Sequence, residues 1–220
     1  RLRLVETRAA RARARRENPK VEPEFTYAYT LCGHEYVANE DFEKAICMYR
    51  HAIKTDERHY NAWYGLGAIY YRQEKFELAE YHFRRALSIN AQSSVLHCYM
   101  GMVLTKNRKY GEAQSYLNTA IQMQPRNPQA HFLKASVHFE RGELHDALSE
   151  FREVMESAPR EPAVFIMMGR VCKRMRDKDA AMLHFSTALD LHPKDNNEVK
   201  LLIDRLHEDD RDVDDEDGPY

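Results

Sequence analysis

The chain is 220 residues long, carries a formal net charge of −2 and is 43% hydrophobic, which is enough apolar material for a packed core. It has no run of about 18 apolar residues and no signal-like apolar segment near its start, which argues against membrane insertion and secretion. Four cysteines occur without C-x-x-C spacing, so we expect small core side chains in a reducing compartment rather than a metal framework.

The first 24 residues form an arginine-rich segment, in which residues 1–16 hold seven arginines and one glutamate. Charge runs of this kind usually stay solvated. We favour that interpretation over a nucleic-acid-binding or nuclear-import signal, which the same cluster also permits. Because the chain begins at Arg1 rather than at methionine, we expect it to be a piece of a longer protein.

From residue 25 to residue 195 the sequence repeats with a period of 34 residues. An alanine recurs five times at this spacing, with a small residue 12 positions before it and a bulky apolar residue four positions after it. The alanines are Ala45, Ala79, Ala113, Ala147 and Ala181. The period predicts five helix-turn-helix repeats, which span residues 26–59, 60–93, 94–127, 128–161 and 162–195.

The second repeat shows the pattern most fully. Trp63, Leu66, Gly67 and Tyr70 have the i, i+3, i+4, i+7 spacing of one helical face, which predicts a first helix over residues 60–73 and a second over 77–89. Three further residues complete the tetratricopeptide signature: Ala79, Phe83 and Ala86. The chain is therefore expected to be all-α, a superhelical solenoid of tetratricopeptide repeats, and such solenoids bind other proteins.

Small residues at the glycine and alanine positions allow the two helices of a repeat to approach closely. An apolar residue three positions before each alanine should fill the turn between these helices, as Phe76 does in the second repeat. In the fifth repeat this position holds Lys178, so we expect a looser turn there.

The end of the chain departs from the repeat. Within residues 196–207, Val199, Leu202, Ile203 and Leu206 form one apolar stripe, which predicts a helix that caps the last repeat. Residues 208–220 follow as an acidic tail, with eight acidic residues between Glu208 and Asp217, and we expect this tail to be disordered.

The sequence lacks the motifs of an enzyme. His34 and Glu35 begin an H-E-x-x-H motif that fails at its last position, and no glycine loop suited to phosphate is present. No nucleophile stands beside a base. We therefore expect no catalytic residue, no metal and no cofactor; an enzyme whose catalytic domain lies outside this piece stays an alternative.

The variable positions of the first helices predict a peptide-binding groove, because these helices line the concave face of such solenoids. Amide and phenol groups together with cations suit the carboxylate and backbone of a peptide, and Glu35 can accept a guanidinium. For Arg72 and Lys106 the alternative is that they only solvate helix ends. The candidate residues are His34, Glu35, Asn61, Tyr64, Tyr71, Arg72 and Lys106.

Several blocks go beyond the generic repeat. The stretch from Phe25 to Glu35, followed by Arg58 to Gly67 and Gln73 to Phe76, closely resembles the C-terminal repeats of the cell division cycle protein 27 family, the third subunit of the anaphase-promoting complex. Ser93 to Leu96 and Ala188 to Pro193 are similar to that family too. The resemblance implies a non-catalytic scaffold of a nuclear ubiquitin ligase of the cell cycle.

In that family the groove captures the C-terminal Ile-Arg tail of coactivators, so the resemblance implies these tails and other subunits of the complex as partners. From the sequence itself we expect neither a membrane nor a nucleic-acid partner. Family members homodimerise through repeats that lie upstream, where this chain has unrelated-looking sequence, so a homodimer is not expected of this chain alone. Two alternatives stay open. One is a generic repeat adaptor or co-chaperone that binds a C-terminal peptide, although Thr30 and His34 replace the lysine and asparagine of such clamps. The other is a different repeat subunit of the same complex.

Overall fold

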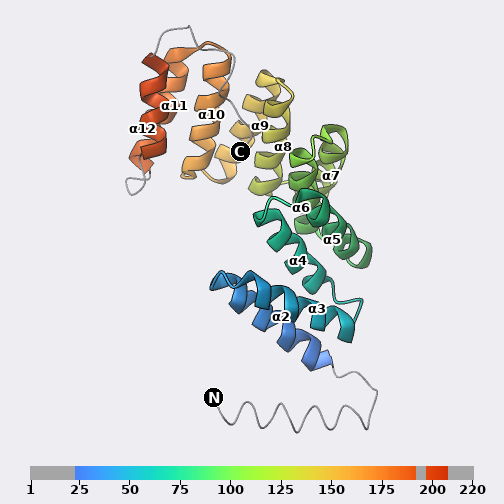
Figure 1. Ribbon diagram of the computed structural model, residues 1–220. Helices are drawn as coiled ribbons and strands as arrows, with labels where there is room; N and C mark the ends of the chain where they lie inside the picture. Colours follow the sequence, from blue (N-terminus) through green and yellow to red (C-terminus); the bar gives the residue numbers. More distant parts are fainter. Residues whose placement is uncertain (1–22, 192–196, 208–220) are drawn as a thin grey trace, which may run out of the picture. The chain divides into compact units, whose positions relative to one another are not determined.

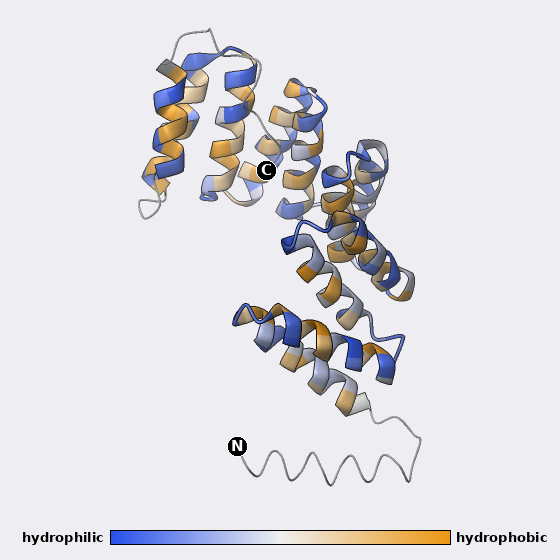
Figure 2. Ribbon diagram, in the orientation of Figure 1, coloured by the Kyte–Doolittle hydropathy of each residue, from blue (hydrophilic) through white to orange (hydrophobic). Residues whose placement is uncertain are grey.

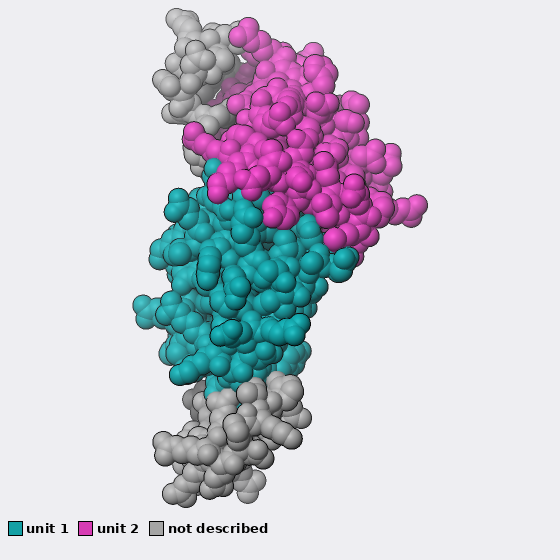
Figure 3. Space-filling view, turned by 90° about the vertical axis from the view of Figure 1, so that its right-hand side faces the viewer, with its two compact units in different colours: residues 1–107 teal, residues 108–220 magenta. Residues whose placement is uncertain are grey.

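The computed structural model describes residues 23–191 and 197–207, and all regular secondary structure within these ranges is α-helical (Figure 1). This confirms the predicted fold class. The predicted arginine-rich segment up to residue 22 and the acidic tail 208–220 lie outside the described residues. The chain divides into two compact units, residues 1–107 and 108–220, which are coloured separately in Figure 3. The division falls between the two helices of the third predicted repeat.

Unit 1 contains α2 (Pro23–Ala38), α3 (Phe42–Thr55), α4 (Tyr60–Arg72), α5 (Phe76–Ile89) and α6 (Ser94–Lys106). The helices pack as pairs, α2 with α3 and α4 with α5, and each pair continues into the next through α3 with α4 and α5 with α6. The first helices α2 and α4 also contact each other. This neighbour-to-neighbour packing is the arrangement expected of stacked repeats.

Unit 2 contains α7 (Tyr110–Met123), α8 (Pro128–Glu140), α9 (Leu144–Ser157), α10 (Pro162–Arg174), α11 (Lys178–Leu191) and α12 (Asn197–His207). Here α8 pairs with α9, and α10 with α11. The last helix, α12, packs on α11 and buries Val199 and Leu206 in one cluster with Phe185. A helix therefore covers the last repeat at the residues where the apolar stripe predicts one.

The helices begin and end close to their predicted limits. In the second repeat α4 ends at Arg72 and α5 begins at Phe76, each one residue from the expected position. Hydrophilic and hydrophobic residues both occur along each helix in Figure 2, as expected for helices that bury one face. None of the described helices combines the length and the apolar character needed to cross a membrane.

Bulky residues after each repeat alanine form the core between paired helices. Phe83, Phe151 and Phe185 are fully buried, and burying one such side chain contributes about 2–3 kcal/mol. They pack where glycine leaves room: a Cβ on Gly67 would lie 2.7 Å from Cδ1 of Phe83. Close helix approach therefore depends on the small residues, as the sequence predicts.

The turns inside the repeats share one backbone conformation. The same turn position has a positive φ in all five repeats, from 58° at Glu74 to 79° at Gly142. The residue after it donates its N–H back to the first helix, for example Glu143 to the carbonyl of His138 at 2.9 Å. The fifth turn keeps this bond, from Asp177 to Cys172 at 3.0 Å, so the prediction of a looser turn at Lys178 is wrong.

All four cysteines are free thiols. Cys98 and Cys172 are buried, as expected of small core residues, and burial raises the pKa of the Cys98 thiol to about 11. Cys47 instead is exposed on α3, so the expectation of core cysteines is wrong at this position.

Candidate functional site

Unit 1 contains a cavity of about 360 Å³ that is lined by the first helices of three successive repeats. Seven of its ten lining residues lie at the fifth, ninth, twelfth or thirteenth position of a repeat, which are among the variable first-helix positions expected to face the groove. The remaining three are Tyr49 on α3, Gly65 on α4 and Tyr99 on α6. The seven are His34, Val37, Tyr64, Ala68, Tyr71, Arg72 and Met102.

Four of the predicted site residues line this cavity: His34, Tyr64, Tyr71 and Arg72. Glu35 is not among the lining residues. It is exposed at a repeat position where the other four repeats bury an aliphatic residue at 0% exposure: Ile69, Val103, Val137 and Val171. The cavity geometry therefore does not support Glu35 as the acceptor of a guanidinium.

The other two predicted residues also lie outside the lining set. Asn61 is half-buried in the first turn of α4, and Lys106 is half-buried at the last residue of α6. Among the lining residues the one fixed cation is Arg72, and none of them is a carboxylate. The cavity thus combines a single positive charge with neutral polar groups.

Phenol groups dominate the polar chemistry of the cavity. The hydroxyl of Tyr64 donates a hydrogen bond of 2.9 Å to that of Tyr99, and their rings meet edge to face at 4.9 Å. The ring of Tyr99 also stacks on the core residue Phe83 at 5.3 Å. Burial raises the pKa of both Tyr64 and Tyr71, so these phenols stay neutral at physiological pH. They offer hydrogen bonds and aromatic faces to a ligand.

Tyr49 reaches the cavity from the core. Its side chain is only 1% exposed, and its hydroxyl lies 2.9 Å from Nδ1 of His34. Its ring occupies space left by two glycines: a Cβ on Gly33 would lie 2.5 Å from Cε1, and a Cβ on Gly65 would lie 2.7 Å from the same atom. Burial raises the pKa of Tyr49 to about 12 and lowers that of His34, so both groups are neutral near pH 7.

The sequence interpretation missed Tyr49, Gly65 and Tyr99 because they occupy repeat positions that normally serve packing. Two signals were present. Tyr49 carries a hydroxyl where the other repeats have phenylalanine or leucine, and Gly65 is a glycine outside the repeat pattern. Both departures lie in the first two repeats.

A second cavity of unit 1, of about 390 Å³, is lined by Glu74, Lys75, Phe76, Glu77, Leu78 and Asn107. Its lining comes from one turn, the start of α5 and a single residue after α6. Nearby, the buried Glu80 accepts a hydrogen bond of 2.8 Å from Nδ2 of Asn107, which ties α5 to the end of α6. We assign these contacts to packing of the repeats.

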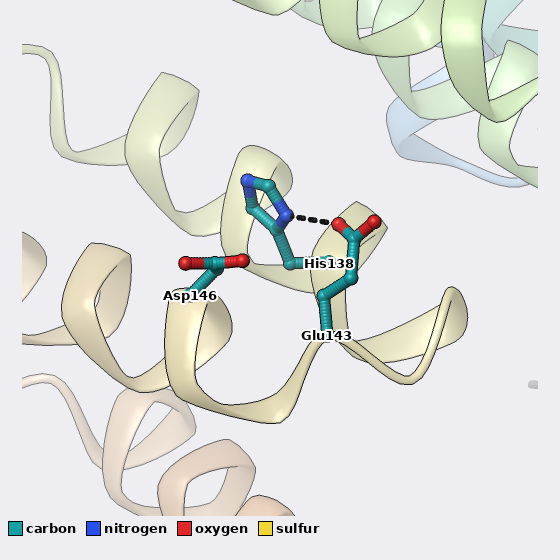
Figure 4. A group of neighbouring side chains, drawn as sticks. All are labelled: His138, Glu143 and Asp146. Carbon is teal, nitrogen blue, oxygen red and sulfur yellow. Dashed lines mark hydrogen bonds and ion pairs between the residues drawn. The ribbon is translucent and has the colours of Figure 1, made fainter.

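Unit 2 brings together one set of potential metal ligands among the described residues: His138, Glu143 and Asp146 (Figure 4). Their ligand atoms lie within 4.8 Å of one another, and imidazole and carboxylate groups are ligands that zinc accepts. Here Nδ1 of His138 pairs with Glu143 at 2.6 Å, and Arg141 pairs with the other oxygen of Glu143 at 2.8 Å. Because Glu143 already has two partners, we assign the group to joining the end of α8 to the start of α9.

The chain is similar in sequence to tetratricopeptide repeats and to named proteins of fungi. The family model described as tetratricopeptide repeat matches residues 32–94 and 100–162. Over 51 residues, 23% of the chain, the sequence is 59% identical to Protein bimA of Emericella nidulans and 57% identical to Anaphase-promoting complex subunit 3 of Schizosaccharomyces pombe. The matched segment covers only 6% and 8% of those two proteins. These matches confirm the resemblance inferred from the sequence.

Solved structures are similar in fold. The crystal structure of PilW, a type IV pilus biogenesis factor, has a TM-score of 0.78 at 21% identity and covers 82% of this chain and 84% of its own. The Cut9–Hcn1 hetero-tetramer of APC/C has a TM-score of 0.74 at 16% identity, over 84% of this chain and 37% of that chain. At such identities the likeness concerns the fold alone.

Proposed function

Because the chain belongs to the tetratricopeptide repeat family, we propose that it is a non-catalytic scaffold whose unit 1 cavity binds the C-terminal tail of a protein partner. The observation that carries the proposal is the composition of this cavity. Four phenols, one imidazole and one guanidinium surround it, and its lining contains no carboxylate. Arg72, the hydroxyls of Tyr71 and Tyr99 and the imidazole of His34 can donate hydrogen bonds to a peptide's terminal carboxylate, whereas Tyr49 and Tyr64 donate within the site.

We propose a tail that ends in Ile-Arg, as the family resemblance implies. Arg72 is exposed at the end of α4 and can pair with the terminal carboxylate, as arginine does in bidentate contacts. The faces of Tyr64 and Tyr71 can hold the guanidinium by cation–π contact, which replaces the role first expected for Glu35. Val37 and Met102 provide an apolar wall for isoleucine.

The names of the relatives support a role in the anaphase-promoting complex. Their resemblance to this chain leads us to propose that the protein is a subunit of the anaphase-promoting complex, acts in ubiquitin conjugation during mitosis and resides in the nucleus. The tail would then be that of a coactivator, and the rest of the solenoid would contact other subunits. Protein–protein contact, rather than catalysis, is the role that stacked repeats serve.

Fluorescence anisotropy with a labelled peptide that ends in Ile-Arg tests the proposal. We expect saturable binding, and a loss of at least tenfold in affinity when the terminal arginine is deleted or when Arg72 is replaced by alanine. Arg126→Ala is the matched control, because this exposed arginine lies in unit 2. No binding, or binding indifferent to the terminal arginine, would contradict the proposal. A preference for an acidic C-terminal peptide would favour the co-chaperone alternative instead.

A further inference from the structure

We propose that Tyr49 is a positioning residue of the cavity, whose hydroxyl holds His34 so that its Nε2–H is presented to an oxygen of the bound peptide. The inference rests on the proposed function of this cavity as a peptide site. It assigns a binding role to a side chain that belongs to the core by its burial and its place in the repeat. Three observations carry it.

The first observation is that the hydroxyl of Tyr49 is not needed for packing. The equivalent residues of the other repeats are also fully buried, and none of them carries a polar atom: Phe83, Leu117, Phe151 and Phe185. A buried hydroxyl costs free energy unless it forms a hydrogen bond. A polar atom at this position therefore indicates a requirement that the other four repeats do not share.

The second observation is a complementary change on the next repeat. Gly65 stands where the other repeats have Leu31, Tyr99, Leu133 and Met167. A Cβ at residue 65 would meet Cζ of Tyr49, the carbon that bears the hydroxyl, and would lie 2.7 Å from Cε1. The missing side chain of α4 thus makes room for the polar end of a side chain from α3. Tyr49 and Gly65, the two residues that depart from the repeat pattern, both line the cavity.

The third observation is the hydrogen bond itself. The hydroxyl of Tyr49 lies 2.9 Å from Nδ1 of His34. Both groups are neutral near pH 7, and a phenol is a better donor than an imidazole N–H, so the hydroxyl donates and Nδ1 accepts. The ring hydrogen of His34 is then on Nε2. Within the described part of the chain this nitrogen forms no hydrogen bond, and His34 lines the cavity.

The consequence is a neutral hydrogen-bond donor among the lining residues of the cavity. A free imidazole exchanges between two tautomers, and only one of them carries a hydrogen on Nε2. The bond to Tyr49 selects that tautomer before the ligand arrives, which is the kind of preorganisation that improves affinity without adding a contact. The recognised group is a carbonyl or carboxylate oxygen of the peptide.

The test combines binding with a spectroscopic signature. Tyr49→Phe restores the residue of three other repeats and should leave thermal stability unchanged, while affinity for the Ile-Arg peptide falls roughly 3- to 10-fold, the equivalent of one hydrogen bond. Side-chain ¹⁵N NMR of His34 should show the Nε2–H tautomer in the unsubstituted chain and a mixture in Tyr49→Phe. A merely structural role for Tyr49 would not change the tautomer.

Two substitutions of His34 leave the core intact and keep the test independent of folding. Glutamine carries its amide nitrogen near the place of Nε2, and asparagine near that of Nδ1, so His34→Gln should retain more affinity than His34→Asn. The Nδ1–H tautomer in the unsubstituted chain, equal binding by Tyr49→Phe, or the reverse order of the two His34 variants would each overturn the inference. If the unsubstituted chain binds no tail peptide, the proposed function fails, and the NMR result still decides the tautomer.

Discussion

Units 1 and 2 are built from the same repeat, but equivalent positions of the two carry different chemistry. Three phenols of the unit 1 cavity correspond to phenylalanines in the fourth repeat, which lies in unit 2: Tyr64 to Phe132, Tyr71 to Phe139, and Tyr49 to Phe151. The ring shape is kept while the hydroxyl is lost. The repeat frame therefore fixes where side chains lie, and small polar additions at those places decide which region can bind a polar ligand.

Arg72 of unit 1 and Arg174 of unit 2 share one repeat position but have different surroundings. Arg72 lies at the rim of the unit 1 cavity. Arg174 holds the same repeat position in unit 2, and there it stacks over the ring of Phe139 at 4.5 Å and donates to the carbonyl of Phe139 at 3.1 Å. In unit 2 the guanidinium thus stabilises contact between neighbouring first helices, whereas in unit 1 it faces a cavity.

Truncation of the unit 2 core should have the largest effect. Phe151 is fully buried among residues of α8, α9 and α10, so Phe151→Ala should lower the free energy of unfolding by about 3–5 kcal/mol. Phe151→Leu is the control, because leucine occupies the same position in the third repeat, and it should cost less than about 1.5 kcal/mol. Urea denaturation followed by far-UV circular dichroism measures both. Equal losses for the two variants would show that the ring volume is not what stabilises this core.

The matching test in unit 1 uses the glycine that clears space for Tyr49. In a helix Gly→Ala normally stabilises by about 0.5–1 kcal/mol, but Gly65→Ala should destabilise by about 1–3 kcal/mol because the new methyl group meets the Tyr49 ring. Trp63 is the single tryptophan of the chain and lies on α4, so its fluorescence reports unfolding of this unit. In a Tyr49→Leu background the cost of Gly65→Ala should shrink or change sign. An unchanged cost in that background would mean that Tyr49 is not the obstacle.

The 34-residue period predicts part of this molecule and not the rest. The helix limits followed from the 34-residue period, because the glycine and alanine positions fix which face is buried. His34, Tyr64, Tyr71 and Arg72, which line the cavity, were predicted to face the groove because they lie at the variable positions of first helices. Tyr49 was missed because the repeat assigns its position to the core, whereas in the fold its ring lies beside two glycines and lines the cavity. Periodicity specifies which residues face inward, but not how far a buried ring extends.

The prediction for Glu35 shows a second limit. Glu35, which lies beside the groove positions, was assigned to the ligand because a carboxylate can accept a guanidinium. The burial of Ile69 and Val103 at the equivalent position shows that this face of a first helix packs between repeats. One position in the period thus separates a residue of the cavity from a residue of the repeat interface.

Acid should weaken unit 1 through His82. This imidazole stacks on Tyr70 at 5.1 Å and lies 5.6 Å from Trp63, and burial lowers its pKa to about 4 from an ordinary value near 6.5. The unfolded chain therefore binds the proton more readily than the folded one between pH 6.5 and 4. The contribution of neutral His82 to the free energy of unfolding should be fully present above about pH 6.5. As the pH drops to 4, the free energy of unfolding should fall by about 1–2 kcal/mol, after a discount for solvent screening.

Denaturation followed by Trp63 fluorescence at a series of pH values measures this loss, and His82→Met, which has the residue of the first repeat, should remove most of it. In unit 2 the equivalent residues are Glu150 and His184. A pH profile that stays the same in His82→Met would assign the acid sensitivity to other groups.

The smallest expected effect comes from the turns, where the two units share one backbone conformation but have different residue types at the left-handed position. Gly142 in unit 2 has φ of 79°, and Glu74 in unit 1 reaches 58° at the same turn position. Nothing lies near a Cβ at residue 142, so Gly142→Ala tests the backbone alone and should cost about 1 kcal/mol.

Gly111→Ala is the matched control, since Gly111 also has open space around it but lies in the first turn of α7, where alanine should be neutral or stabilising. The reciprocal change Glu74→Gly should gain less than Gly142→Ala loses, because glycine also gives the unfolded chain more freedom. Thermal melts of the three variants measure these differences, and equal shifts at residues 111 and 142 would mean that the left-handed turn stores no strain.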